Sequence, residues 1–369
     1  MGQIKAIHQI APAFPYGDAI GNQMFRIREL LRQWGVESQV YVQARDRRLA
    51  DPGVDYAHYP SSPDNILIYH YSTRSALTEF VQQLPDQVIV YYHNVTPPEF
   101  FHEYDPAFAA KLEQGRRDVA SFKNRPCAWA GSEYNRQDLL AMGFKHVTVV
   151  PYFLQFDELL VAADSPAGRQ VSARYADGWT NLLFVGRLAP NKRQDDLIRV
   201  FGYYHRLVNP RSRLILVGSD ANLPSYRFEL EIMAENLAPH HIHLPGAVSF
   251  KELGGYYRAA TVFVCLSEHE GFGIPLLEAM AFDVPVLAFN STAVPYALGE
   301  AGILINRKHY DVIGELIDLL VHDKSLRRRV IRKQKERLFE TRPAQAKAAL
   351  RRALSQLGLE IGSGIPQME

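Results

Sequence analysis

Two glutamates flank a glycine-containing turn in the segment S-E-H-E-G-F-G-I-P-L-L-E-A-M-A at residues 267–281. Glu270 precedes the Gly-Phe-Gly turn and Glu278 follows it, with seven residues between the two carboxylates. Pro275 suits the first turn of a helix, where a backbone N–H is not needed. We therefore expect a helix to begin here, with the amides of the turn at its N-terminus, which is a ready site for phosphate.

The chemistry expected of this segment is the binding of a pyrophosphate between two sugars. The amides that would meet the phosphates are those of Gly271, Phe272, Gly273 and Ile274. A carboxylate repels a phosphate but accepts hydrogen bonds from a sugar diol. Glu278, expected in the first helical turn, would therefore bind a ribose, and Glu270 a second sugar beyond the pyrophosphate. The alternative is that both glutamates only complement the helix dipole. The joint arrangement favours a nucleotide-sugar.

A second candidate site is F-V-G-R-L-A-P-N-K at residues 184–192, where Arg187 and Lys192 follow an apolar strand. Two cations at a strand end can neutralise a pyrophosphate and stabilise it as a leaving group. The alternative is a solvated loop with ordinary surface charges. No Asp-x-Asp pair stands in a metal-binding context, and Asp195-Asp196 is expected on a solvated helix face. No metal ion and no other cofactor is therefore expected.

Further candidates also stand at or near strand ends. His93 follows the apolar strand in Y-Y-H-N-V-T-P-P, although a lone histidine at such a position is more often structural. Gly218 follows the strand Leu214–Val217, and Val248 belongs to a turn that we expect to contact the donor base. Gly21 lies in the segment after the first strand.

A repeating pattern of short apolar strands and amphipathic helices must position these residues. The first helix carries Ile20, Met24, Ile27, Leu31 and Trp34 on one face and stops at Gly35. Strands are expected at Lys5–Ile10, Ser38–Val42, Asn65–Tyr71, Val88–His93, Cys127–Ala130 and Val147–Val150. The second half has strands at Leu182–Val185, Leu214–Val217, His241–Leu244, Val262–Leu266, Val286–Phe289 and Ile303–Ile305.

This alternation predicts an α/β fold made of βαβ units with parallel sheets. The pattern breaks between residues 151 and 180, where a short helix and a turn-rich stretch are expected to connect two domains. We predict two doubly wound Rossmann-like domains facing across a cleft, over residues 1–165 and 166–342. A C-terminal helix near 343–360 is expected to return to the first domain. Ligands of such sheets bind at the carboxyl ends of the strands, so the cleft is the expected site.

Composition limits the class of protein. The chain has 369 residues, 47% of them hydrophobic, and a formal net charge of +1, which argues against a nucleic-acid partner. Residues 321–352 nevertheless hold 12 Lys or Arg against 3 Asp or Glu. This segment is expected to form an exposed helical face. The alternative is contact with an anionic membrane, to which Arg26, Arg28 and Arg32 on the first helix would add.

Cysteine usage and hydropathy indicate the compartment. Cys127 and Cys265 both lie in apolar runs, so two buried thiols and a reducing environment are expected. The N-terminal sequence lacks the pattern of a signal peptide, and no window is apolar enough to span a bilayer. The expected location is cytoplasmic, and the alternative is a peripheral position on the inner face of the membrane.

The motif residues also resemble a known family. E-G-F-G-I-P-L-L-E-A-M-A, followed by F-D-V-P-V-L-A and S-T-A-V-P, resembles the E-x7-E signature of the retaining family 4 glycosyltransferases of GT-B fold. The run L-P-G-A-V-S-F-K-E-L-G-G-Y-Y-R-A-A-T-V-F-V and the segments G-S-E-Y-N-R-Q-D-L and V-V-P-Y are similar to that family too. The likeness covers most of residues 1–305 and is strongest over 181–299.

This resemblance implies a hexosyltransferase that acts with retention and without a metal ion. Its donor would be GDP-mannose or a UDP-hexose, and its acceptor a hydroxyl of a glycan, a glycolipid or a small molecule. Arg187 and Lys192 would stabilise the leaving diphosphate. His93 would face the anomeric region of the donor sugar, where it would hydrogen-bond the sugar or support positive charge.

The first loop departs from the family pattern of adjacent glycines. Here Gly17 and Gly21 are separated by D-A-I, so the sequence does not determine which backbone amide contacts the phosphate. Asp18 or Asn22 could contact the acceptor instead.

The same sequence features leave three alternative functions to consider. An NAD-dependent oxidoreductase is disfavoured, because G-x-G-x-x-G is absent and the second strand ends in Gln43 where an acidic ribose ligand is needed. An epimerase or phosphorylase of the same architecture, and a non-catalytic nucleotide-sugar-binding protein, remain alternatives.

Overall fold

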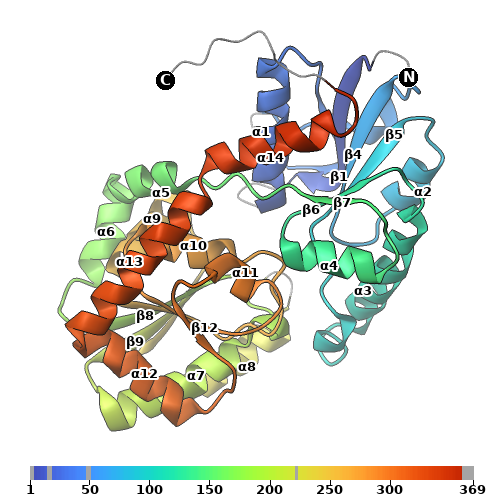
Figure 1. Ribbon diagram of the computed structural model, residues 1–369. Coiled ribbons are helices and arrows are strands. Elements are labelled where there is room, and N and C mark those ends of the chain that lie inside the picture. Colours follow the sequence, from blue (N-terminus) through green and yellow to red (C-terminus); the bar gives the residue numbers. More distant parts are fainter. Residues whose placement is uncertain (1–3, 15–18, 47–50, 221–222, 360–369) are drawn as a thin grey trace. The chain divides into compact units, whose positions relative to one another are not determined.

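The computed structural model describes residues 4–14, 19–46, 51–220 and 223–359, and the chain divides into two compact units (Figure 1). The first contains the described parts of Met1–Pro97, Ala110–Phe153 and Arg342–Glu369, and the second contains those of Pro98–Ala109 and Leu154–Thr341. Each unit is built on one parallel β-sheet. The prediction of two doubly wound Rossmann-like domains is confirmed.

The sheet of the first unit has the order β3-β2-β1-β4-β5-β6-β7. Its strands are β1 (Ala6–Phe14), β2 (Val40–Arg45), β3 (Val54–Asp55), β4 (Asn65–Tyr71), β5 (Gln87–Tyr92), β6 (Ala128–Ala130) and β7 (Val147–Val149). β4 has the predicted bounds. β3 was not predicted, because its two residues are too few to show an apolar pattern. The strand order reverses between β1 and β4, which is where ligands of such sheets bind.

Helices of the first unit bury their apolar faces on this sheet. They are α1 (Ala19–Gln33), α2 (Leu77–Gln82), α3 (Pro106–Val119, whose first turn belongs to the second unit), α4 (Glu133–Ala141) and α14 (Pro343–Ser355). Short 3₁₀ turns lie at Tyr56–His58, Pro98–Phe100 and Ala120–Phe122. α1 buries the predicted face, including Met24, Ile27 and Leu31, and Gly35 follows it with φ +77°.

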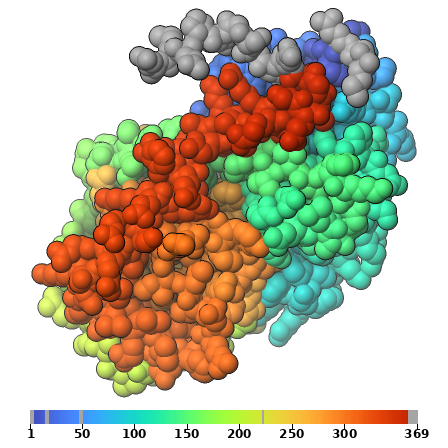
Figure 2. Space-filling view, in the orientation of Figure 1, coloured from blue at the N-terminus to red at the C-terminus, as the bar shows by residue number. Residues whose placement is uncertain are grey.

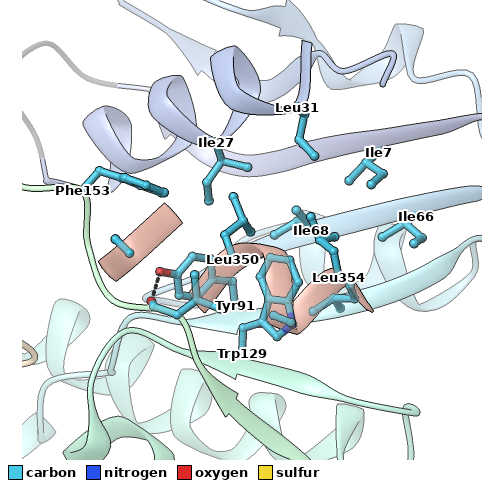
Figure 3. Close-up of a cluster of buried hydrophobic side chains, with 14 of the residues drawn as sticks. Ile7, Ile27, Leu31, Ile66, Ile68, Tyr91, Trp129, Phe153, Leu350 and Leu354 are labelled. Atoms are coloured by element: carbon cyan, nitrogen blue, oxygen red, sulfur yellow. Dashed lines mark hydrogen bonds between the residues drawn. The ribbon is translucent and has the colours of Figure 1, made fainter. Parts of the chain in front are cut away.

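The core of the first unit joins residues from the two ends of the sequence. Figure 3 shows Ile7, Ile66 and Ile68 of the sheet beside Leu350 and Leu354 of α14. Leu350 and Leu354 have no exposed surface. α14 is therefore an integral part of this core.

The sheet of the second unit has the order β10-β9-β8-β11-β12-β13. Its strands are β8 (Thr180–Val185), β9 (Ser212–Val217), β10 (Ile242–Gly246), β11 (Val262–Cys265), β12 (Val286–Phe289) and β13 (Ile303–Ile305). Its helices are α5 (Phe156–Ala163), α6 (Pro166–Arg174), α7 (Gln194–Tyr203), α8 (Pro224–Leu237), α9 (Phe250–Ala259), α10 (Ile274–Ala281), α11 (Val294–Leu298), α12 (Tyr310–His322) and α13 (Lys324–Glu340). A 3₁₀ turn at Pro190–Lys192 precedes α7, and a π-helical turn at Tyr204–Val208 follows it.

The division between the units falls earlier than residue 165. The first unit's middle segment ends at Phe153, because α5 and α6 both pack against α9 of the second unit. A Cβ at Gly255 of α9 would lie 2.4 Å from the carbonyl oxygen of Gly168 in α6, so the glycine permits this close approach. The stretch expected to be rich in turns is therefore largely helical.

The two cysteines differ in burial. Cys265 is buried, but Cys127 is only partly buried, which corrects the prediction of two buried thiols. Among the described residues, no helix is long and apolar enough to cross a membrane.

Candidate functional site

The strand order of the second unit reverses between β8 and β11, so the loops that follow these neighbouring strands flank a switch point of the sheet. The loop after β8 carries Lys192, and the loop after β11 carries Glu270. The structure brings these two predicted residues together: Lys192 Nζ lies 2.6 Å from Glu270 Oε2. Their side chains are 17% and 13% exposed, which places the ion pair in a partly desolvated position.

Hydrogen bonds from the backbone and the side chain of Asn191 fix the two loops against each other. The carbonyl oxygen of Asn191 accepts from Glu268 N at 2.9 Å, and its side-chain amide donates to His269 O at 3.1 Å. Thr292, from the S-T-A-V-P segment after β12, accepts from Glu270 N through Oγ1 at 2.8 Å. Three loops therefore hold the backbone around Glu270.

The Gly-Phe-Gly turn leads directly into α10. Gly273 is the N-cap residue with φ +91°, a conformation that favours glycine, and Pro275 stands in the first turn as predicted. Ile274 is the first helical residue, and Gly271 and Phe272 precede the cap. The first amides of a helix have no partner within it, so this end of α10 offers donors to an anion.

Glu278 lies in the second turn of α10 and not in the first, because the helix begins at Ile274. Its Oε2 accepts a hydrogen bond from the Tyr257 hydroxyl of α9 at 2.7 Å. Burial raises the pKa of the Glu278 carboxyl to about 7, and the hydrogen bond from Tyr257 opposes that rise. The carboxylate is thus oriented by a neighbouring helix and titrates near neutral pH.

The remaining candidates of this unit lie in loops of the same sheet. Arg187 is exposed and follows β8. A Cβ at Gly218 would lie 2.0 Å from Gly186 O, so a glycine there lets the loop after β9 lie against the backbone that precedes Arg187. Val248 is partly buried in the turn between β10 and α9, and Gly246 O in that region accepts from Gly218 N at 3.0 Å.

The expectation that Asp195-Asp196 forms a solvated face is wrong for Asp196. Its side chain is only 2% exposed. It accepts hydrogen bonds from Lys308 Nζ at 2.8 Å and from the Tyr310 hydroxyl at 2.7 Å. Both partners follow β13, far along the chain, so the local sequence around Asp196 contains no signal of this pairing.

His93 of the first unit is buried, and both of its ring nitrogens are hydrogen-bonded. Nδ1 lies 2.5 Å from the Tyr152 hydroxyl, and Nε2 lies 2.8 Å from His70 Nδ1. His70 Nε2 in turn lies 3.0 Å from Gln9 Oε1, and Gln9 Nε2 donates to Met24 O at 2.9 Å. A continuous chain of hydrogen bonds thus links β1, β4 and the segments after β5 and β7.

The direction of this chain follows from its end. Because the Met24 carbonyl can only accept, the Gln9 amide donates to it and presents Oε1 to His70. His70 therefore carries its proton on Nε2, His93 carries its proton on Nε2, and Tyr152 donates to His93 Nδ1. Burial lowers the pKa of His93 to about 3, so its imidazole is neutral at physiological pH. The alternative that His93 supports developing positive charge does not fit this environment.

The first turn of α1 contains Gly21, which is buried, and Asn22, which is exposed. Gly17 and Asp18 lie outside the described residues. Gln23 on the same helix accepts from Phe153 N at 2.8 Å and donates to Pro151 O at 3.3 Å. α1 therefore holds the segment at which the chain leaves the first unit.

Sequence reasoning missed several residues that position the candidates. His70 interrupts the apolar strand I-L-I-Y-H-Y, and this polar residue in a buried strand is a signal that could have been used. Tyr257, Thr292 and Tyr152 carry no comparable signal, because tyrosine and threonine are common in such segments.

Comparisons with known proteins find similarity over most of the second unit. Residues 172–337 match the family model described as glycosyl transferases group 1. Over 158 residues the chain is 30% identical to O-antigen chain mannosyltransferase B of Escherichia coli, covering 42% of this chain and 41% of that protein. It is 28% identical over 171 residues to a GDP-mannose-dependent alpha-(1-6)-phosphatidylinositol monomannoside mannosyltransferase of Mycobacterium tuberculosis, covering 44% and 43%. These matches span less than half the length of each relative.

Solved structures share the fold over nearly the whole chain. Sucrose-phosphate synthase from Thermosynechococcus elongatus matches with a TM-score of 0.70 at 17% identity, covering 96% of this chain and 99% of that one. HepE from Anabaena, in complex with UDP and glucose, matches with a TM-score of 0.71 at 15% identity, covering 95% and 99%. The chain therefore shares the two-domain α/β fold of these proteins, and the predicted fold class is confirmed.

Proposed function

We propose that the chain is a retaining hexosyltransferase, since residues 172–337 match the family model of group 1 glycosyl transferases. It transfers a hexosyl group from GDP-mannose or a UDP-hexose to a hydroxyl of a glycan, a glycolipid or a small molecule. The names of the mannosyltransferases and the UDP complex of HepE support this choice of donors. The single observation that carries the proposal is the Lys192–Glu270 pair at the switch point of the sheet, beside the N-terminus of α10.

Each candidate residue has a role in donor binding. Arg187, Lys192 and the amides at Gly271–Ile274 bind the pyrophosphate, because cations and helix N-termini favour anions. Glu270 accepts hydrogen bonds from hydroxyls of the donor sugar. Glu278 accepts hydrogen bonds from the ribose. Gly218 and Val248 contact the nucleoside, and Gly21 is the candidate of the first unit for donor binding.

The proposed reaction proceeds on the front face of the donor sugar. The bond between the anomeric carbon and the phosphate oxygen breaks, and a bond to the acceptor oxygen forms on the same face. The acceptor proton passes to the departing phosphate oxygen, so the products are the glycoside and a nucleoside diphosphate. Arg187 and Lys192 stabilise the charge on the leaving group and take the part of a metal ion.

The neutral His93 contributes through a hydrogen bond and not through charge. In its assigned tautomer Nε2 is a donor, which is the form suited to a sugar hydroxyl oxygen. To make that contact, His93 exchanges its hydrogen bond to His70 for one to the sugar. The buried tyrosine partner at Nδ1 keeps this tautomer in place.

The basic surface of α13 provides a contact with an anionic membrane, where a lipid-linked acceptor would be found. Arg328, Arg329 and Arg332 are exposed on this helix, which lies on the surface in Figure 2. Arg28 does not contribute, because it is buried and pairs with Asp51 at 2.8 Å. Replacing the three exposed arginines by serine should abolish sedimentation with anionic vesicles at low salt. Failure of the wild type to sediment would end this part of the proposal.

The function is tested by thermal unfolding of the wild type and Glu278→Ala with UDP, GDP, ADP and NAD, each without metal. A ligand present at ~100 times its Kd stabilises the folded state by about 2.7 kcal/mol, which gives a shift of a few degrees. Stabilisation by one nucleoside diphosphate, weakened in the variant, supports the proposal. Stabilisation by NAD alone, or by none of the four, contradicts it.

A further inference from the structure

Four charged side chains of the second unit form a closed ring with alternating signs. Arg193 donates to Glu268 Oε1 at 2.9 Å and to Asp196 Oδ1 at 3.1 Å. Lys308 Nζ completes the ring, 2.7 Å from Glu268 Oε1 and 2.8 Å from Asp196 Oδ2. Each cation therefore bridges the same two carboxylates.

The ring joins three loops at the carboxyl edge of the sheet. Arg193 and Asp196 belong to the start of α7 after β8, Glu268 follows β11, and Lys308 follows β13. Arg193 is the neighbour of Lys192 in sequence, and Glu268 stands two residues before Glu270. The ring therefore includes a near neighbour in sequence of each member of the Lys192–Glu270 pair.

Two features indicate that this arrangement is strongly determined. Arg193 has φ +52°, a left-handed conformation that a non-glycine residue holds only when its surroundings enforce it. Asp196 is almost fully buried, and a buried carboxylate must be compensated by charge and hydrogen bonds. Lys308 is further fixed over the ring of Phe289, with Nζ 4.7 Å from the ring centroid.

We propose that the ring formed by Asp196, Arg193, Glu268 and Lys308 positions the donor site and neutralises Glu268. This inference rests on the proposed function, because it concerns the loop that receives the diphosphate. Glu268 is a second carboxylate on that loop, and without compensation it repels the diphosphate. Without compensation Glu268 would also compete with Glu270 for the ammonium group of Lys192. Arg193 and Lys308 remove both effects by holding Glu268 in the ring.

The test uses Lys308→Met, Glu268→Gln and the double variant, with Lys5→Met as the matched control on an exposed ion pair of the first unit. Calorimetry measures the Kd of UDP and GDP, in EDTA, for each protein. Lys308→Met should bind the nucleotide on the order of tenfold more weakly, and this loss should shrink at high salt. The double variant should bind within about threefold of Glu268→Gln, because the Glu268 carboxylate that Lys308 neutralises is then absent and Arg193 still pairs with Asp196. The control should bind like the wild type.

A purely structural role predicts a different pattern. The loss caused by Lys308→Met would then persist in full when Glu268→Gln is added, would not depend on salt, and would follow the fall in Tm; that pattern overturns the inference. If Lys308→Met does not fold, Arg193→Met and its double variant with Glu268→Gln provide the same comparison. A wild type that binds neither UDP nor GDP contradicts the proposed function itself. Equal binding by the wild type and the ring variants contradicts only the inference.

Discussion

Lys192 Nζ lies 2.6 Å from Glu270 Oε2, so the loops after β8 and β11 share one ion pair at the switch point of the sheet. In the proposed reaction the cation faces the leaving diphosphate and the carboxylate faces the hydroxyls of the donor sugar. The pair therefore sets the distance between the two groups that must act on opposite sides of the anomeric bond.

Glu270→Gln should reduce donor turnover by about 10²–10³-fold, the usual effect of removing one preorganised group that contacts the reacting centre. The amide keeps the shape of the side chain but leaves Lys192 without its anionic partner. Steady-state release of the nucleoside diphosphate measures the loss. Glu300→Gln is the matched control, because Glu300 is 90% exposed. Equal turnover in the wild type and Glu270→Gln would contradict the role of Glu270.

Glu278 should make the stability of the chain depend on pH. Burial raises the pKa of its carboxyl from 4.5 to about 7, so the unfolded chain loses this proton first as the pH rises. The stabilisation is therefore complete below about pH 4.5 and is lost as the pH rises through 7, by up to about 3 kcal/mol. Glu278→Gln should lack this component. Unfolding curves of both proteins between pH 4.5 and 8 measure the contribution of Glu278 to the free energy of unfolding. If this free energy varies with pH in the same way in both proteins, the prediction is wrong.

Nucleotide binding should show the opposite dependence on pH. The ribose needs the ionised Glu278 as an acceptor, so affinity should rise as the pH increases through 7. Tyr257→Phe removes a hydrogen bond that lowers the pKa of Glu278, and it should move this rise to higher pH. Calorimetry of nucleoside diphosphate binding at a series of pH values gives the pH midpoint of the rise in affinity. The same midpoint in the wild type and Tyr257→Phe would count against the assignment of Glu278 to the ribose.

The histidine chain should keep both rings neutral. Nitrogen-15 NMR of labelled histidine should show His70 and His93 as Nε2–H tautomers that do not titrate down to about pH 4. Tyr152→Phe leaves His93 Nδ1 buried without its donor and should cost about 1–3 kcal/mol of unfolding free energy. A His93 resonance that titrates near its ordinary pKa would show that the assigned direction of the chain is wrong.

α14 should be required for the stability of the first unit. Leu350 of α14 has no exposed surface and packs in the same cluster as Ile7 and Ile68. Leu350→Ala should therefore lower the free energy of unfolding by about 2–5 kcal/mol. Denaturant unfolding measures this loss, and Leu319→Ala, at a position 47% exposed on α12, is the control with little expected effect. A loss no greater than that of the control would mean that α14 is not part of the folded core.

Much of the fold was predictable from the sequence because each strand is a short apolar run bounded by turns. β12 and β13 have the bounds that their Val, Ile and Leu residues predict. The boundary between the units was misplaced because α6 begins at Ser165-Pro166, a sequence that also suits a turn. The side-chain cap from Ser165 and the packing of α6 against α9 favour the helix over a turn. The packing depends on tertiary structure, so the local sequence does not reveal it.

The candidate site was predictable where it is local in sequence. The turn before α10 and the position of Pro275 follow from residue types within one segment. The charge ring was not predictable, because Asp196 and Lys308 are 112 residues apart and their pairing depends on the order of the strands. The neutral state of His93 was missed for the same reason, since Tyr152 and His70 come from other parts of the sheet.

The most direct test of the proposed function is donor turnover by the wild type and Lys192→Met with GDP-mannose, UDP-glucose and UDP-galactose in EDTA. The proposed function predicts release of a nucleoside diphosphate from one donor without metal, and NMR should show that the sugar product keeps the anomeric configuration of the donor. It also predicts a fall of at least about 10²-fold in the variant. Turnover of none of the three donors by the wild type, or equal turnover by both proteins, would contradict it.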